Sequence, residues 1–113
     1  MMPAPLLKRV YEAPSDADGL RVLVDRLWPR GLSKDKAKVD LWLKDLAPSD
    51  ELRRDLHAHP DHWAGFRKAY RAELADNAAL DELKALAKRR SLTLLFAARD
   101  QEHNTAVVLK TLL

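Results

Sequence analysis

Two short runs of continuous apolar residues constrain the fold of this chain more than any other feature. The segment Arg21 to Leu27 contains Val22-Leu23-Val24, and the second run is Leu92 to Ala97. Short runs that are rich in aliphatic and β-branched residues are typical of strands buried on both faces, as in parallel sheets. Both runs therefore need other elements of the chain to cover them.

Amphipathic segments can supply that cover. Apolar residues recur at three- and four-residue spacing from Trp63 to Leu74 and from Leu80 to Ala87, which predicts two helices. A last helix is expected from about Asn104. Ser49 stands where an N-cap would begin a further short helix that runs to about His57.

Two further segments are candidate strands. Leu6 to Tyr11 is a short apolar-rich run that suits an edge strand, and Lys38 to Asp45 alternates in a way that suits a strand, with a helix as the alternative. The order of strands and helices predicts an α/β fold, with a small open, partly parallel sheet of three to four strands covered by helices. At 113 residues, we expect a single α/β domain, residues 1–113.

Composition narrows the cellular setting. The chain has no cysteine, which excludes disulfides and thiolate chemistry and fits a reducing compartment. The segment Met1 to Lys8 lacks the apolar run of a secretory signal, and no apolar stretch approaches the ~20 residues that cross a membrane. We therefore expect a cytoplasmic protein without a membrane partner. Its net charge of +3 permits an anionic partner without demanding one.

Ligands of open α/β sheets bind outside the carboxyl ends of the strands. That rule selects two segments, Arg26 to Lys34 after one predicted buried strand and Arg99 to Asn104 after the other. These segments hold the candidate site.

The same segments carry a family resemblance. The run Val24-Asp25-Arg26-Leu27-Trp28-Pro29-Arg30-Gly31, together with Leu92 to Asp100 and Glu102-His103-Asn104, is similar to the YeaO-like bacterial proteins, a family of unknown function (DUF488). The resemblance extends from about Lys8 to the final helix. It implies membership and a fold but no established activity.

Two departures from the family pattern concern histidines. Thr105 stands where such proteins often have a histidine, and Leu56-His57-Ala58-His59-Pro60 replaces a Gly-His-Asp-Pro-like stretch. A role for the missing histidine therefore does not carry over to this chain.

Arginines follow both predicted buried strands. The planar guanidinium groups of Arg26, Arg30 and Arg99 match the geometry of phosphate or carboxylate groups. The structural alternative is an ion pair in which Arg26 or Arg30 is held by Asp25 or Asp100. In that case the arginines tie loops together and bind no ligand.

Trp28, His103 and Asn104 complete the candidate site. Trp28 could line a pocket or stack on a nucleic-acid base. The alternative is a buried structural residue whose indole N–H donates a hydrogen bond within the protein. His103 is the one obvious proton-transfer group and the candidate catalytic residue. Asn104 lies at an expected helix start, where backbone N–H groups could bind an anion. The alternative is that Asn104 is simply the N-cap of that helix. In that case the carboxylates of Asp100 and Glu102 compete with an incoming anion for the helix start.

Three histidines and an aspartate fall within six residues, at His57, His59, Asp61 and His62. Their spacing matches none of the standard zinc patterns, and the segment has the composition of a turn between helices. We therefore expect a polar loop, with no metal, and no cofactor for the protein.

Two classes of function fit these observations. The first is a domain that binds a small phosphate- or carboxylate-bearing molecule, with or without catalysis, in a concave site where Arg26, Arg30, Arg99 and His103 converge. The second is a non-catalytic nucleic-acid-associated or protein-interaction module. The sequence favours no oligomeric state. The second class requires one open basic face, built from Lys34, Lys36, Lys38, Lys84, Lys88 and Arg89.

Overall fold

The computed structural model of the chain describes residues 3–113. Met1 and Met2 lie outside the described residues. The expected domain, residues 1–113, and the segment Met1 to Lys8 are therefore described only from residue 3 onward. None of the helices within residues 3–113 is long and apolar enough to cross a bilayer.

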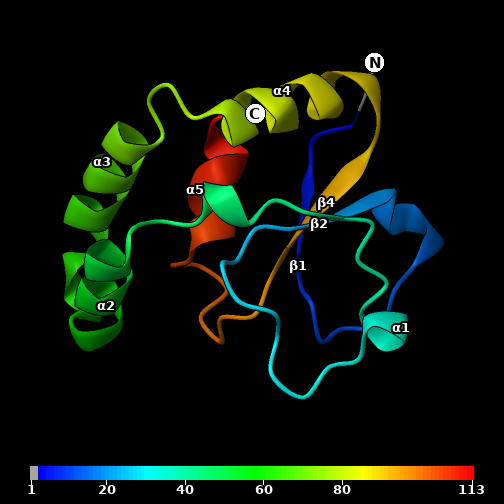
Figure 1. Cartoon of the computed structure of the whole chain (residues 1–113), viewed down its shortest axis with the longest axis horizontal. Coiled ribbons are helices and arrows are strands. Elements are labelled where there is room, and N and C mark those ends of the chain that lie inside the picture. The colour runs from blue at the N-terminus through cyan, green and yellow to red at the C-terminus, as the bar shows by residue number, and fades with distance from the viewer. Residues whose placement is uncertain (1–2) are drawn as a thin grey trace.

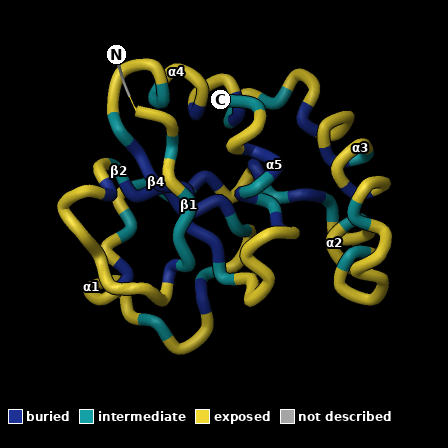
Figure 2. Tube along the Cα trace, turned by 180° about the vertical axis from the view of Figure 1, so that it is seen from behind, coloured by how far each residue is buried: buried dark blue, intermediate teal, exposed yellow. Residues whose placement is uncertain are grey.

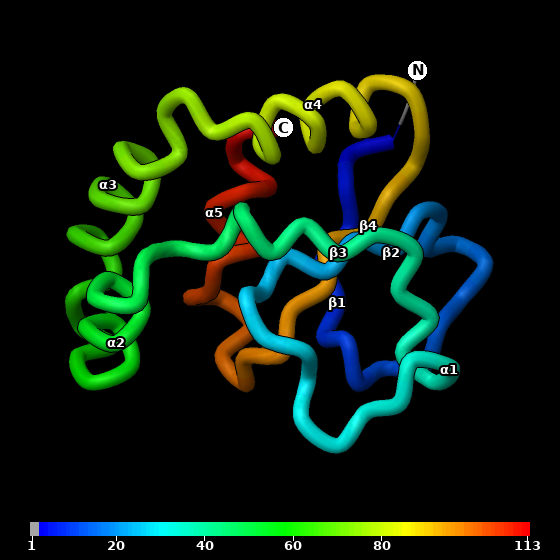
Figure 3. The backbone as a smooth tube through the Cα atoms, viewed as in Figure 1, coloured from blue at the N-terminus to red at the C-terminus, as the bar shows by residue number. Residues whose placement is uncertain are grey.

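Four strands form one sheet in the order β1-β4-β2-β3, and every neighbouring pair is parallel (Figures 1 and 3). The strands are β1 (Leu6–Arg9), β2 (Leu20–Leu23), β3 (Leu41–Trp42) and β4 (Leu92–Phe96). The α-helices are α1 (Lys34–Ala37), α2 (Asp50–Ala58), α3 (Trp63–Glu73), α4 (Ala78–Arg89) and α5 (Thr105–Thr111). Short 3-10 helices span Asp16–Asp18, Lys44–Leu46 and Pro60–His62. The predicted α/β class is confirmed, and the sheet is parallel throughout the described residues.

The two apolar runs are the two central strands. Val22 pairs with Leu94 and Leu23 with Leu95, and all four side chains are fully buried. The predicted edge position of the first strand is also confirmed, because β4 is the one described strand with which β1 pairs. Figure 2 shows the buried trace concentrated in these strands and in α5.

One face of the sheet carries the larger core. Val22, Val24, Leu94 and Phe96 pack there against the apolar sides of the two helices predicted from periodicity and of the expected last helix. The helix residues that complete this core are Phe66 and Tyr70 of α3, Leu80 and Leu83 of α4, and Ala106, Val108 and Leu109 of α5. These helices therefore shield one face of β2 and β4 from water.

The opposite face has no long helix over it. Leu23 and Leu95 pack there with Val10 and with Ala37 of α1, in a smaller cluster. Loop residues between β2 and β3 complete its cover, namely Trp28, Leu32 and Val39, with Trp42 from β3. The connection between β2 and β3 is thus part of the core and not a passive linker.

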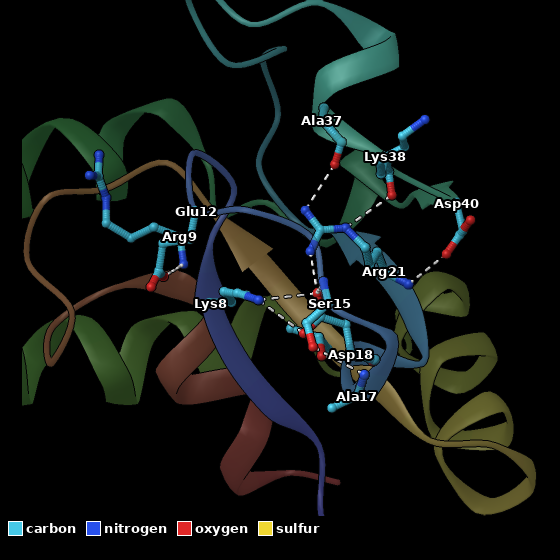
Figure 4. Close-up of polar contacts among 11 residues, drawn as sticks. Lys8, Arg9, Glu12, Ser15, Ala17, Asp18, Arg21, Ala37, Lys38 and Asp40 are labelled. Carbon is cyan, nitrogen blue, oxygen red and sulfur yellow. Dashed lines mark hydrogen bonds and ion pairs between the residues drawn. The ribbon is translucent and has the colours of Figure 1, made fainter.

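A buried ion network fills the remainder of that face. Lys8 Nζ lies 3.1 Å from Asp18 Oδ1, and Arg21 donates through Nη1 to the other carboxylate oxygen. The side chains of Asp18 and Arg21 are each only 5 % exposed. Figure 4 shows Lys8 and Arg21 approaching Asp18 from two sides.

Arg21 also fixes the loop that follows β2. Its Nε and Nη2 donate to the carbonyls of Lys38 and Ala37 at 3.0 and 2.9 Å, and its backbone N–H donates to Asp40 Oδ2 at 2.9 Å (Figure 4). The guanidinium thereby satisfies the carbonyls at the end of α1, which has only four residues. This contact and the buried side chain of Ala37 hold the short helix against the sheet.

The segment Lys38 to Asp45 is less regular than its alternation suggests. Only Leu41–Trp42 pairs with β2, and a 3-10 turn begins at Lys44. Lys38 adopts the left-handed conformation, with φ of 51°, where it caps α1. The expected strand is therefore confirmed in its centre but not at its ends. The expected N-cap of α2 is confirmed, because Ser49 Oγ accepts a hydrogen bond from Leu52 N.

Removing the carboxylate of Asp18 should destabilise the protein strongly. The substitution Asp18→Ala leaves Arg21 buried without its acidic partner, and breaking a buried pair in this way costs about 3–5 kcal/mol. Urea unfolding at pH 7, followed by circular dichroism, measures the loss. Asp16→Ala removes an exposed acid from the same 3-10 helix and should change the free energy of unfolding by no more than about 0.5 kcal/mol.

The same network predicts a pH dependence. Burial raises the pKa of Asp18, but hydrogen bonds from the Ser15 N–H, Lys8 and Arg21 outweigh it and hold that pKa below its usual value. A carboxylate with a lowered folded pKa stabilises the fold above its unfolded pKa of about 3.9 and loses that contribution as the pH falls through the folded value. The stability gap between wild type and Asp18→Ala should therefore narrow below about pH 4. A gap that is the same at pH 3 and pH 7 would contradict this assignment.

Candidate functional site

The parallel sheet brings the segments after β1, β2 and β4 to one edge. Backbone bonds extend the pairing past the strand ends, from Val10 N to Phe96 O at 2.8 Å and from Val24 N to Leu95 O at 3.2 Å. The following loops leave the sheet on the same side, as the lower part of Figure 3 shows. We call this region, made of residues 9–12, 24–33 and 97–104, the carboxyl edge.

Arg9 and Tyr11 fasten the three loops of the carboxyl edge together. Arg9 donates through Nε to the carbonyl of Ala98 at 3.0 Å and through Nη2 to that of Ala97 at 2.9 Å. Its guanidinium lies 5.1 Å from the centre of the Tyr11 ring, and Tyr11 Oη donates to the carbonyl of Arg30 at 2.9 Å. Sequence reasoning did not single out either residue, because their partners are distant in the chain.

Arg26 is turned toward the start of α2. It donates through Nη1 to Asp50 Oδ1 at 3.1 Å and through Nη2 to the Pro48 carbonyl at 3.2 Å. The side chains of Arg26 and Asp50 are 44 % and 49 % exposed, so the pair is solvated. The acid that holds Arg26 is therefore Asp50, and not Asp25 or Asp100.

Arg30 and Arg99 differ from Arg26. Both residues are exposed, and within residues 3–113 neither guanidinium makes a hydrogen bond or an ion pair. The Arg30 carbonyl is fixed by Tyr11, whereas Arg99 directly follows the two carbonyls that Arg9 holds. The backbone at each arginine is thus anchored while its charged group faces solvent.

Asp25 joins the ends of the two central strands. Its Oδ2 accepts a hydrogen bond from Ala97 N at 2.8 Å, and its carbonyl accepts one from Trp42 Nε1 at 2.7 Å. Burial raises the pKa of the Asp25 carboxyl, and the hydrogen bond from Ala97 offsets that effect in part. This carboxylate therefore bonds to backbone and does not neutralise an arginine.

Trp28 is held inside its own loop. Its Nε1 donates to the Leu32 carbonyl at 2.6 Å, and its ring meets Trp42 edge to face with 5.5 Å between ring centres. The side chain is half-buried in the smaller core cluster. Trp28 thus shapes the loop that carries Arg30.

Asp100, His103 and Asn104 form a closed turn before α5. Asp100 Oδ1 accepts from the backbone N–H of Glu102 at 2.9 Å and of His103 at 3.0 Å, and Oδ2 lies 3.0 Å from His103 Nδ1. Hydrogen bonds from Glu102 and His103 hold the pKa of Asp100 below its usual value. Asn104 donates to the Asp100 carbonyl at 2.8 Å and accepts from Val107 N at 3.0 Å. Both polar atoms of the Asn104 side chain are therefore used in the turn and the helix cap.

His103 also contacts α3. Its ring meets the Trp63 ring edge to face with 5.0 Å between ring centres. With Nδ1 facing Asp100, the nitrogen left for a ligand is Nε2. His103 is exposed, so a proton on Nε2 can exchange with solvent.

The sequence led us to expect a concave site at the carboxyl edge, and two hollows are found elsewhere in the structure. One hollow, of about 560 Å³, lies along α4 beside Lys84 and Lys88. A second hollow of about 300 Å³ lies between the β3 end and the start of α4. Neither hollow is lined by Arg26, Arg30, Arg99 or His103.

The histidine segment folds more tightly than a loose polar loop. His59, Asp61 and His62 are exposed, and one potential metal-ligand atom of each lies within 4.8 Å of the others. His57 is outside this group. The spacing of these residues in the sequence gave no indication that the turn would bring them together.

Comparisons with known proteins relate the chain to one family. Residues 6–113 match the family model described as "Inactive DUF488-N3 subclade". The chain is 47 % identical to an uncharacterized protein of Mycobacterium tuberculosis strain H37Rv over 105 residues, which cover 93 % of this chain and 89 % of the relative. It is 45 % identical to the uncharacterized protein YeaO of Escherichia coli K12 over 103 residues, which cover 90 % of each chain. No solved structure matches the chain.

The raised pKa of Asp25 predicts the effect of removing its charge. A carboxyl whose pKa is raised in the fold favours the folded state when protonated, and this contribution is lost as the pH rises through the folded pKa. Asp25→Asn keeps an acceptor for Ala97 N–H without the charge. We therefore expect this variant to be at least as stable as wild type at pH 7 in urea unfolding. Its free energy of unfolding should also change less between pH 4 and pH 7 than that of wild type.

Asp35→Asn, at an exposed position of α1, removes one charge elsewhere and serves as the control. A loss of more than about 1 kcal/mol in Asp25→Asn at pH 7 would show that the ionised carboxylate is needed for the fold.

Proposed function

Because the chain belongs to the DUF488 family, in the subclade described as inactive, we propose that it is a non-catalytic domain that binds an anionic ligand at the carboxyl edge. The ligand presents a phosphate or carboxylate group, and Arg30 and Arg99 contact that group. A chain without cysteine suits the reducing cytoplasm, where we expect this binding to occur.

The observation that carries the proposal is the contrast between acids and arginines at this edge. Asp25 bonds to Ala97 N–H, and Asp100 bonds to backbone N–H groups and His103. The guanidinium groups of Arg30 and Arg99 therefore keep their donors for an external anion. Arginine donates in a fork that matches phosphate and carboxylate oxygens.

The other residues of the candidate site support this contact. Arg26 is paired with Asp50 on the surface, and such exposed pairs contribute only about 0–1 kcal/mol, so Arg26 can turn to a ligand at small cost. Trp28 and Asn104 hold the loops that carry the arginines. His103 donates to an anion from Nε2 when its ring is protonated, because Nδ1 faces Asp100.

The exposure of the two arginines bears on the kind of ligand. Arg30 and Arg99 are both exposed, so the contact that we propose is with an anionic group that projects from its carrier. We therefore expect binding to depend on the charged group more than on the remainder of the ligand.

The alternative function requires one basic face, and the arrangement of lysines argues against it. Lys34, Lys36 and Lys38 belong to α1 and its cap, whereas Lys84, Lys88 and Arg89 belong to α4. Figures 1 and 2 both place α4 along the top of the molecule and α1 in its lower part. The two groups therefore do not form the continuous basic surface that favours nucleic acid.

The double variant Arg30→Ala/Arg99→Ala tests the proposal. Inorganic phosphate should raise the melting temperature of wild type in a saturable way, because a ligand that binds only the folded state stabilises it. The double variant should lose most of that rise. Its stability without phosphate should remain within about 0.5 kcal/mol of wild type, since neither guanidinium has a partner to lose.

The matched control is Arg54→Ala/Arg90→Ala, which removes the same charge from two exposed arginines on α2 and at the end of α4. Sodium chloride holds the ionic strength constant. Equal responses of the two double variants to phosphate, or no saturable response in wild type, would refute the proposed site.

A further inference from the structure

We propose that the corner between α2 and α3 binds a divalent transition-metal ion through His59, Asp61 and His62. One potential ligand atom of each residue lies within 4.8 Å of the others. Two donors that each lie about 2.1 Å from one ion are at most about 4.2 Å apart, so small side-chain rotations complete the site. All three residues are exposed and can make such rotations.

The backbone of the corner brings the ligands together. His59 N donates to the Asp55 carbonyl at 2.8 Å, and His62 N donates to the His59 carbonyl at 2.9 Å. The 3-10 helix Pro60–His62 places side chains three residues apart above one another, and Pro60 fixes its first turn. As a result, the rings of His59 and His62 are stacked, with 4.6 Å between ring centres.

Asp55 orients one of the proposed ligands. Its Oδ2 lies 3.0 Å from His62 Nδ1. Metal-binding histidines commonly donate their second ring nitrogen to a carboxylate, which fixes the tautomer and directs the other nitrogen at the ion. In this arrangement His62 binds the metal through Nε2, and Asp55 is a positioning residue.

The donor set selects the class of metal. Two imidazoles and one carboxylate suit Zn²⁺, Co²⁺, Ni²⁺ and Cu²⁺ better than Mg²⁺ or Ca²⁺, which prefer oxygen ligands. Three protein ligands leave at least one coordination position for water. The ligands stand outside both core clusters, so the ion binds reversibly and folding does not depend on it.

Titration of the untagged full-length chain with Zn²⁺ by calorimetry, and with Co²⁺ by visible absorption, tests the site. We expect one ion per chain. His59→Ala and His62→Ala should each weaken binding by at least about tenfold, and Asp55→Asn by about tenfold or more through the loss of orientation. His57→Ala, on α2 outside the group, should change the affinity by less than about twofold.

Melting curves in excess chelator show whether the variants are folded and whether the metal is structural. Because the apolar core holds the fold, chelator should leave the melting temperature of wild type unchanged, and the four variants should melt cooperatively in its presence. The site is refuted by the absence of saturable Zn²⁺ and Co²⁺ binding, by wild-type affinity in His59→Ala and His62→Ala, or by an equal loss in His57→Ala. A drop of several degrees in the melting temperature of wild type with chelator would contradict reversible binding, because it would show that the metal is structural.

Discussion

Two parallel strands that must be buried on both faces determine how the rest of this chain is arranged. Every residue of β4 is buried, as are the last three of β2. Helices α3, α4 and α5 cover one face, but no long helix in the described part of the chain covers the other. That face is closed by the β2–β3 connection and by the ion network of Lys8, Asp18 and Arg21. Burying these charges costs desolvation free energy. In return, Arg21 anchors α1, which helps to cover the second face.

The proposed function is a consequence of this closure. Since the strands are parallel, the loops that close the second face begin at the same edge as the loop before α5. Arg9 and Tyr11 then join these loops through backbone carbonyls, Asp25 and Asp100 bond to backbone N–H groups, and the guanidinium groups of Arg30 and Arg99 face solvent. The proposed binding surface consists of these loops, and the proposed metal site between α2 and α3 lies outside it.

The sequence was sufficient for features that depend on local pattern. The continuous runs predicted the central strands, apolar periodicity predicted α3 and α4, and Ser49 was identified as a helix cap. Contacts between distant residues were not predictable in this way. Arg26 is held by Asp50, which is 24 residues away, and Trp42, from the segment that suits a strand, packs in the smaller core beside Trp28. The four-residue helix α1 depends on Arg21 and has no periodicity of its own.

Titration of isotopically labelled protein with inorganic phosphate, followed by backbone amide NMR, tests the central claim most directly. The claim is that the anion binds at the carboxyl edge. It predicts saturable shift changes concentrated in residues 9–12, 27–31 and 97–104, with α4 unaffected. Changes centred on Lys84 and Lys88 of α4, or small changes spread without saturation over all basic residues, would contradict it.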